Sequence, residues 1–93
     1  MTNDRLARLP GGDLISEGIE DLAHGRETVA ALLVSIGAPR LRRGGLAIAA
    51  TLADPEHQLY ALLNRQAQDA AHSRYNALLG RLVSFERALG CAT

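Results

Sequence analysis

The chain has 93 residues, ten acidic and ten basic side chains, and no tryptophan. This length suits one small domain with a marginal core, because such a chain buries only about 60–65% of the surface exposed in its unfolded form. The hydrophobic fraction of 47% is too high for a disordered protein. A formal net charge of zero argues against general nucleic-acid binding, which normally uses a strongly basic domain.

Leucine and alanine dominate the composition, with sixteen residues of each, whereas aromatic side chains are scarce. Both are strong helix formers, so the composition predicts an all-α fold. All ten basic residues are arginine, which indicates either paired hydrogen bonds to phosphate or carboxylate groups or the codon bias of a GC-rich genome, and we expect a protein of bacterial type. The single cysteine, Cys91, excludes an internal disulfide and a multi-cysteine zinc site. No signal peptide or membrane-length apolar run is present, which predicts a cytoplasmic protein.

Residues 1–12 end in Leu-Pro-Gly-Gly and are predicted to form a flexible arm before a single helical domain at 13–90. The first helix is predicted at about 14–24, with Asp13 as N-cap and Gly25 as the left-handed residue after its end. Its polar side chains are predicted to form a solvated acidic face: Glu17, Glu20, Asp21 and His24. The Asp-Leu-Ala-His segment resembles the Glu-x-x-His element of di-iron bundles. Those bundles need the element on two helices, so we expect no metal here.

A second helix is predicted from about residue 29, with a stop or kink near Gly37 because Pro39 cannot donate a backbone hydrogen bond. Arg40, Arg42 and Arg43 follow before a glycine pair. They indicate a contact with phosphate or an acidic partner, a solvated turn, or ion pairs with the acidic first helix. Residues 46–53 alternate large and small apolar side chains as a strand does. Since no other segment offers a strand partner, we predict a packed connector there.

Two further helices are predicted. One is at about 55–67 with Asp54 as cap and Pro55 in its first turn, and the other is at about 70–89 with Asp69 as cap and Gly90 at its end. A single kinked rod is the alternative for the two. The last helix, the longest, carries a heptad-like apolar seam of Ala71, Tyr75, Leu78, Leu82, Phe85 and Leu89. This seam predicts either the spine of a bundle of about four helices or a contact with a second copy of the chain.

The first turn of that helix is unusually polar and contains His72, Arg74, Tyr75 and Asn76. Asparagine is a poor helix former, so Asn76 needs a hydrogen-bonding partner. That partner is either a ligand or bound protein, or a group of the preceding helix or of the 45–53 loop that fixes the helix register.

Arg65 and His72 are separated by six residues, which fits the loose R-x(4–6)-H spacing of the all-α HEPN-type RNases. In such an enzyme the histidine would be the general base and the arginine would stabilise the charge on phosphorus. Ten arginines and three histidines in this chain give about one such match by chance, so the spacing alone identifies no family.

The sequence therefore predicts a small non-enzymatic accessory or regulatory subunit that binds a protein, either a second copy or a different partner. It predicts no cofactor, no metal and no membrane. The predicted binding residues are His72, Arg74, Tyr75, Asn76, Leu78, Leu82 and Phe85. The alternative is a protein that acts on nucleic acid, either through Arg65 and His72 as a minimal RNase or through Arg40, Arg42 and Arg43 as a regulator.

Overall fold

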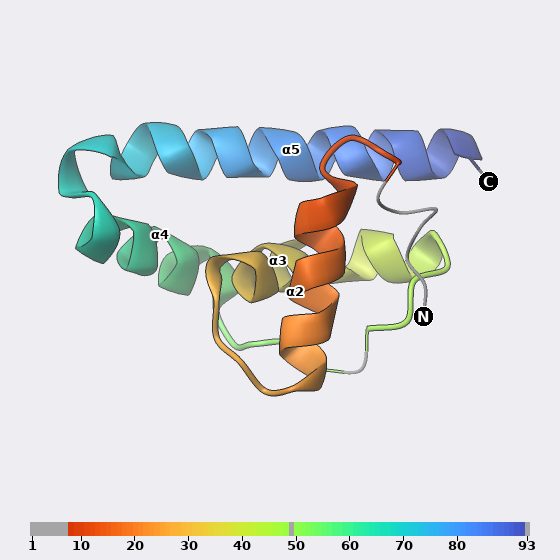
Figure 1. Ribbon diagram of the computed structural model, residues 1–93, viewed down its shortest axis with the longest axis horizontal. Coiled ribbons are helices and arrows are strands. Elements are labelled where there is room, and N and C mark those ends of the chain that lie inside the picture. The colour runs from red at the N-terminus through yellow and green to blue at the C-terminus, as the bar shows by residue number, and fades with distance from the viewer. Residues whose placement is uncertain (1–7, 49, 93) are drawn as a thin grey trace.

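The structure is a computed structural model that describes residues 8–48 and 50–92, and within these ranges the regular elements are all helical (Figure 1). In chain order, with the labels of Figure 1, they are α2 (Gly12–Ala23), α3 (Val29–Arg43), α4 (Pro55–Gln66), the 3₁₀ turn η1 (Gln68–Ala70) and α5 (Ala71–Ala92). The predicted all-α bundle of about four helices, with the last one longest, is confirmed.

The central helix is α3, which packs against α2, α4 and α5. In Figure 1, α5 lies along one side of the molecule, α2 crosses in front of α3, and α4 runs back toward the start of α5. Helices α3 and α5 run in the same direction. The described chain measures 38 × 24 × 20 Å along its principal axes.

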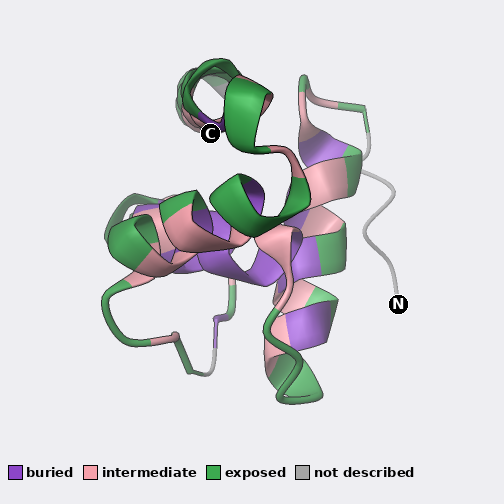
Figure 2. Ribbon diagram, turned by 90° about the vertical axis from the view of Figure 1, so that its left-hand side faces the viewer, coloured by how far each residue is buried: buried purple, intermediate pink, exposed green. Residues whose placement is uncertain are grey.

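The core is built around α3, most of whose residues are buried (Figure 2). The six apolar residues of the predicted α5 seam all lie in this core or pack against it, although the helix that contacts the other three is α3. The largest fully buried side chains come from all four α-helices: Ile15, Leu33, Val34, Leu41, Leu59, Leu63 and Phe85. Because most of these are aliphatic, the core relies on close helix approach rather than on large aromatic rings.

The start of α2 differs from the prediction, because the N-cap is Gly11 and not Asp13. Gly11 has a φ of 75°, and a Cβ atom at this position would lie 3.2 Å from the carbonyl oxygen of Arg81 in α5. This close approach requires glycine and starts the helix earlier than predicted. Leu9 packs against the core, so this part of the predicted arm is docked, while residues 1–7 lie outside the described part.

The other helix ends match the predictions only in part. Gly25 takes a left-handed φ of 72° after α2, as predicted. Asp54 does precede α4, but it has a φ of 49° and makes no capping hydrogen bond through its side chain. The side chain that does cap a helix is Thr28, whose Oγ1 accepts a hydrogen bond from the Ala31 amide at 3.1 Å.

Of the two alternatives predicted near Gly37, a stop or a kink, the stop is wrong, because α3 continues through Pro39 to Arg43. A proline in a helix interior removes one hydrogen bond and costs about 3 kcal/mol. Continuing the helix buries Ala38 and Leu41 beneath it, whereas Pro39 itself lies on the exposed side. Burial of these two residues offsets the cost.

Helices α4 and α5 are separate, because Ala67, with a φ of −156° and a ψ of 82°, interrupts the helical backbone. Asp69 lies inside η1 and makes no capping bond through its side chain, contrary to the prediction. The last helix does not end before Gly90 but continues to Ala92.

The segment between α3 and α4 is a packed connector in its described residues, 46–48 and 50–53, as predicted. Ile48 is buried in the core, and the amide of Leu52 donates a 3.0 Å hydrogen bond to Ser35 Oγ. The Arg42 guanidinium donates to the carbonyl oxygen of Ile48 from Nε (3.1 Å) and Nη2 (2.9 Å). These bonds tie the connector to α3.

Candidate functional site

The polar turn at the start of α5 is bonded within itself. Asn76 Nδ2 lies 3.2 Å from His72 Nε2, one helical turn away, and both residues are exposed. This bond gives Asn76 a partner in its own helix rather than in α4 or in the connector. Arg74 is exposed and has no hydrogen bond or ion pair with any residue of the described chain.

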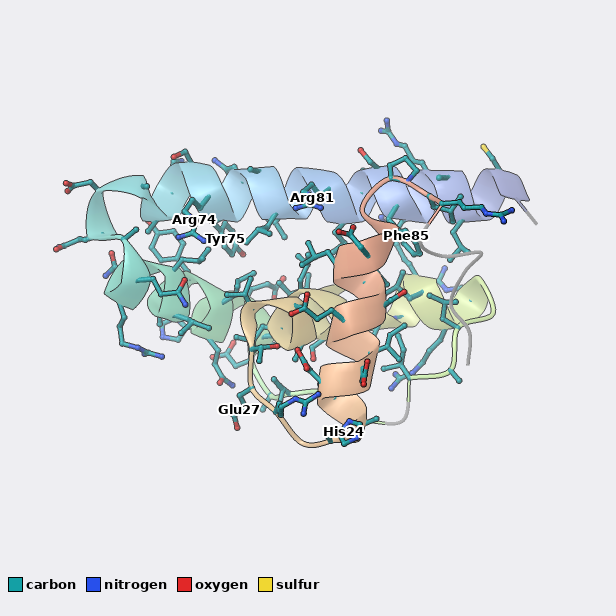
Figure 3. The ribbon with its side chains drawn as sticks, viewed as in Figure 1. His24, Glu27, Arg74, Tyr75, Arg81 and Phe85 are labelled. Atoms are coloured by element: carbon teal, nitrogen blue, oxygen red, sulfur yellow. The ribbon has the colours of Figure 1, made fainter. Side chains whose placement is uncertain are left out.

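Tyr75 points from α5 toward α4 and packs edge-on against Tyr60, with ring centroids 5.4 Å apart and an interplanar angle of 68° (Figure 3). Burial raises the pKa of the Tyr75 hydroxyl above its ordinary value, and the nearby Glu56 carboxylate raises it further. The ring therefore holds α4 and α5 together in its neutral form.

The three apolar residues of the predicted binding set lie toward the inside of the chain. Phe85 is 0% exposed and Leu82 is 4% exposed, while Leu78 is partly buried against the same core. Figure 3 shows Phe85 pointing from α5 into the bundle. Phe85 is thus a core residue, and a partner can reach this part of α5 only through its flanking side chains.

Arg65 and His72 are both exposed, and no hydrogen bond or ion pair joins them in the described part of the chain. Neither residue lines the hollows described below. The acidic face of α2 likewise assembles no centre: among the described residues, no group of three or more His, Cys, Asp or Glu side chains is placed to hold a metal ion.

One member of that acidic face is not solvated. Asp21 is only 6% exposed, and it accepts hydrogen bonds from Thr28 Oγ1 (2.5 Å) and from Arg26 Nε (3.0 Å). The Thr28 bond is the main cause that holds the pKa of Asp21 below its ordinary value; Arg26 acts in the same direction, and burial opposes both. The network fixes the turn between α2 and α3, so its role is structural.

The three arginines at the end of α3 have different surroundings. Arg42 is bonded to the connector, as described above. Arg40 Nη1 lies 3.5 Å from Glu86 Oε1 of α5, so it pairs with α5 and not with the acidic first helix. Arg43 makes no hydrogen bond or ion pair with the rest of the described chain.

Arg40 and Arg43 line a groove between α3 and α5, which we call the α3–α5 groove. It consists of two adjoining hollows of about 450 and 340 Å³. Its apolar lining comes from both helices: Ile36, Pro39, Leu79, Leu82, Val83 and Leu89. Its charged lining is Arg40, Arg43, Glu86 and Arg87.

Two glycines hold the helices close beneath this groove. A Cβ atom at Gly37 would lie 2.8 Å from Leu82 Cδ1, and one at Gly44 would lie 2.4 Å from Leu89 Cδ2. The glycines are seven residues apart, and so are the leucines. This matched spacing keeps α3 and α5 in contact over two turns and leaves the groove at the surface.

The groove combines an exposed apolar side chain with arginines that lack partners. Val83 is 39% exposed, and Val83 and Tyr60 are the two large apolar residues of the described chain that are this exposed. Arg87, like Arg43, has no hydrogen bond or ion pair with another described residue. The groove can therefore take an apolar group and carboxylates together.

The sequence indicates Leu82 and the arginines at the end of α3 separately, but it does not predict that they line the same groove. The signal that could have joined them is the seven-residue repeat of Gly37 and Gly44, which matches that of Leu82 and Leu89. Glycine inside a helix is unfavourable by about 0.5–1 kcal/mol relative to alanine, so Gly37 indicates a close helix contact.

No protein family, curated protein or solved structure matches this chain. In the described residues, no helix has the length and apolar character needed to cross a membrane.

Proposed function

We propose that this chain is a small non-enzymatic accessory subunit that binds another protein through the α3–α5 groove. The observation that carries the proposal is the α3–α5 groove, in which an apolar lining that includes the exposed Val83 is bordered by three arginines and one carboxylate. An apolar surface rimmed by polar groups is typical of a protein-binding site. Arginine is enriched at such interfaces because its planar group makes paired hydrogen bonds to carboxylates.

Binding fits the groove better than catalysis. A catalytic site needs a nucleophile or general base within hydrogen-bonding reach of its partner groups. The charged groups of the groove are three guanidinium groups and one carboxylate, and that carboxylate is paired with Arg40. Such groups can hold a partner in place, whereas a guanidinium cannot donate or remove a proton at neutral pH. We also propose that this binding takes place in the cytoplasm.

Site-specific photo-crosslinking in the cells of origin tests the proposal. A photoreactive amino acid replaces Val83 in one variant and Ala77 in a control variant, because Ala77 lies exposed on α5 outside the groove. We expect one protein adduct from position 83 and none from position 77. The adduct partner, once purified, should bind the wild-type chain about tenfold more tightly than it binds Val83→Asp.

Three outcomes contradict the proposal: no protein adduct at position 83, equal adducts at both positions, or unchanged affinity in Val83→Asp. An RNA adduct at position 83 would support the nucleic-acid alternative instead.

A further inference from the structure

The charges along the α3–α5 groove are strongly one-sided. Arg40, Arg43 and Arg87 line it, and Glu86 is its one carboxylate. Glu86 is already paired with Arg40, so Arg43 and Arg87 lack partners within the described chain. A partner that brings carboxylates to these two arginines would form charge-assisted hydrogen bonds there.

The apolar lining sets the second requirement. The residues of α5 that line the groove lie between Leu79 and Gly90, which corresponds to a length of about 16 Å at 1.5 Å per residue. That length matches about three turns of a docked helix, since each turn rises 5.4 Å. An amphipathic helix places an apolar side chain at every third or fourth residue, which suits a lining of Ile36, Leu79, Val83 and Leu89.

A second copy of the chain can offer either carboxylates for the arginines or apolar side chains for the lining, but not both from one surface. In a symmetric dimer the same groove would face itself, so unpaired arginines would oppose arginines. The acidic helix α2 of another copy could offer Glu17 and Glu20. However, its large apolar residues are wholly or partly buried under its own chain, as Ile15 and Leu22 are. A different protein is therefore the better occupant.

We infer that the α3–α5 groove binds an acidic amphipathic helix of a partner protein. The helix packs apolar side chains against Val83 and Leu79, and its Asp or Glu side chains pair with Arg43 and Arg87. This inference rests on the proposed function and adds the chemical class of the partner segment.

Selection from a random library of 16-residue peptides, displayed against the purified full chain, tests the inference. The selection runs in parallel on the wild type, on the double variant Arg43→Glu, Arg87→Glu, and on the control Arg8→Glu. Arg8 is exposed and does not line the groove, so the control carries the same kind of charge reversal outside it. We expect the wild type and the control to enrich peptides with apolar residues at helical spacing and Asp or Glu between them.

On the double variant the apolar spacing should persist and the acidic preference should disappear. A synthetic peptide of the wild-type consensus should bind Arg43→Glu about tenfold more weakly by fluorescence anisotropy, and Arg8→Glu within about twofold of the wild type. The inference is overturned by enrichment of neutral or basic peptides, by an extended rather than helical spacing, by no enrichment, or by an acidic preference that survives in the double variant.

The crosslinking result separates this inference from the proposed function. If crosslinking at position 83 identifies a verified protein partner but the peptide selection fails, the proposed function is supported and only the acidic helix is overturned. Failure of both experiments removes both proposals.

Discussion

Two of the helix pairs that share α3 both have glycine at the contact, but their charged side chains have opposite surroundings. Gly18 brings α2 against α3, since a Cβ atom there would lie 2.3 Å from the carbonyl oxygen of Ala30. At Gly37 and Gly44 a Cβ atom would meet leucine side chains of α5 instead of backbone. At the α2–α3 turn the charged side chains are bonded to groups of the same turn, because Arg26 and Thr28 both donate hydrogen bonds to Asp21.

Along the α3–α5 groove, Arg43 and Arg87 lack such partners in the described chain. Charges bonded within the chain contribute to its stability, whereas unpaired surface charges contribute little and remain free to bind another molecule. The two pairs therefore predict opposite responses to mutation.

The largest expected effect comes from the core that both pairs share. Phe85→Ala should lower the free energy of unfolding by about 3–5 kcal/mol, because this fully buried ring would leave a cavity. Val83→Ala, two residues earlier on the exposed side, should change it by less than about 1 kcal/mol. Urea unfolding measures both. The Phe85→Ala loss should be the same at every protein concentration, and a loss that grows on dilution would show that α5 is held by a second copy.

Replacing glycine with alanine should change the free energy of unfolding in opposite directions at two positions. Gly18→Ala should destabilise the chain by about 1–3 kcal/mol, because the new methyl group would push α2 away from the α3 backbone. Gly80→Ala should stabilise it by about 0.5–1 kcal/mol, because a Cβ atom there meets open space and alanine favours the helix. Thermal unfolding followed by circular dichroism compares them. Equal effects would contradict the close crossing of α2 and α3.

The hydrogen bonds to Asp21 in the α2–α3 turn should make the free energy of unfolding depend on pH. Because the folded chain holds the pKa of Asp21 below its ordinary value of 3.8, the unfolded chain takes up the proton first as the pH falls. The stabilisation is thus fully present above about pH 4 and is lost as the pH falls through the lowered pKa. Asp21→Asn should cost about 1–3 kcal/mol at pH 7 and should flatten the acid loss.

Glu20→Gln is the matched control, since Glu20 is an exposed carboxylate beside Asp21 in α2. Urea midpoints between pH 7 and pH 2.5 should follow the wild-type profile in this control. If Asp21→Asn keeps the full acid loss, another carboxylate causes it.

The smallest expected change in stability lies at the open groove. Arg43→Glu and Arg87→Glu should alter the free energy of unfolding by less than about 0.5 kcal/mol, because neither side chain is paired in the described chain. Urea unfolding of these variants beside Arg26→Gln sharpens the comparison, since Arg26 bonds Asp21 and its replacement should cost more. If Arg43→Glu lowers the free energy of unfolding more than Arg26→Gln does, the conclusion that Arg26 stabilises the fold and Arg43 does not is contradicted.

The sequence by itself determined the all-α class, the helix count and the left-handed glycine after α2. These follow from local physics: the helix propensity of leucine and alanine, the 3.6-residue spacing of apolar side chains, and the backbone freedom of glycine. The same local rules failed at Pro39 and Asp13, where contacts with distant parts of the chain override them. Burial of Leu41 keeps α3 intact past Pro39, and the approach of Arg81 places Gly11 at the start of α2.

Only the tertiary structure decided which charged residues are bonded within the chain. Asp21 and Glu20 are neighbours with similar side chains, yet one is buried under Thr28 and Arg26 and the other is exposed. Arg42 and Arg43 are also neighbours, yet one bonds Ile48 and the other lines the groove. Such differences depend on which helix packs against which face, and that is set by contacts between residues far apart in the sequence.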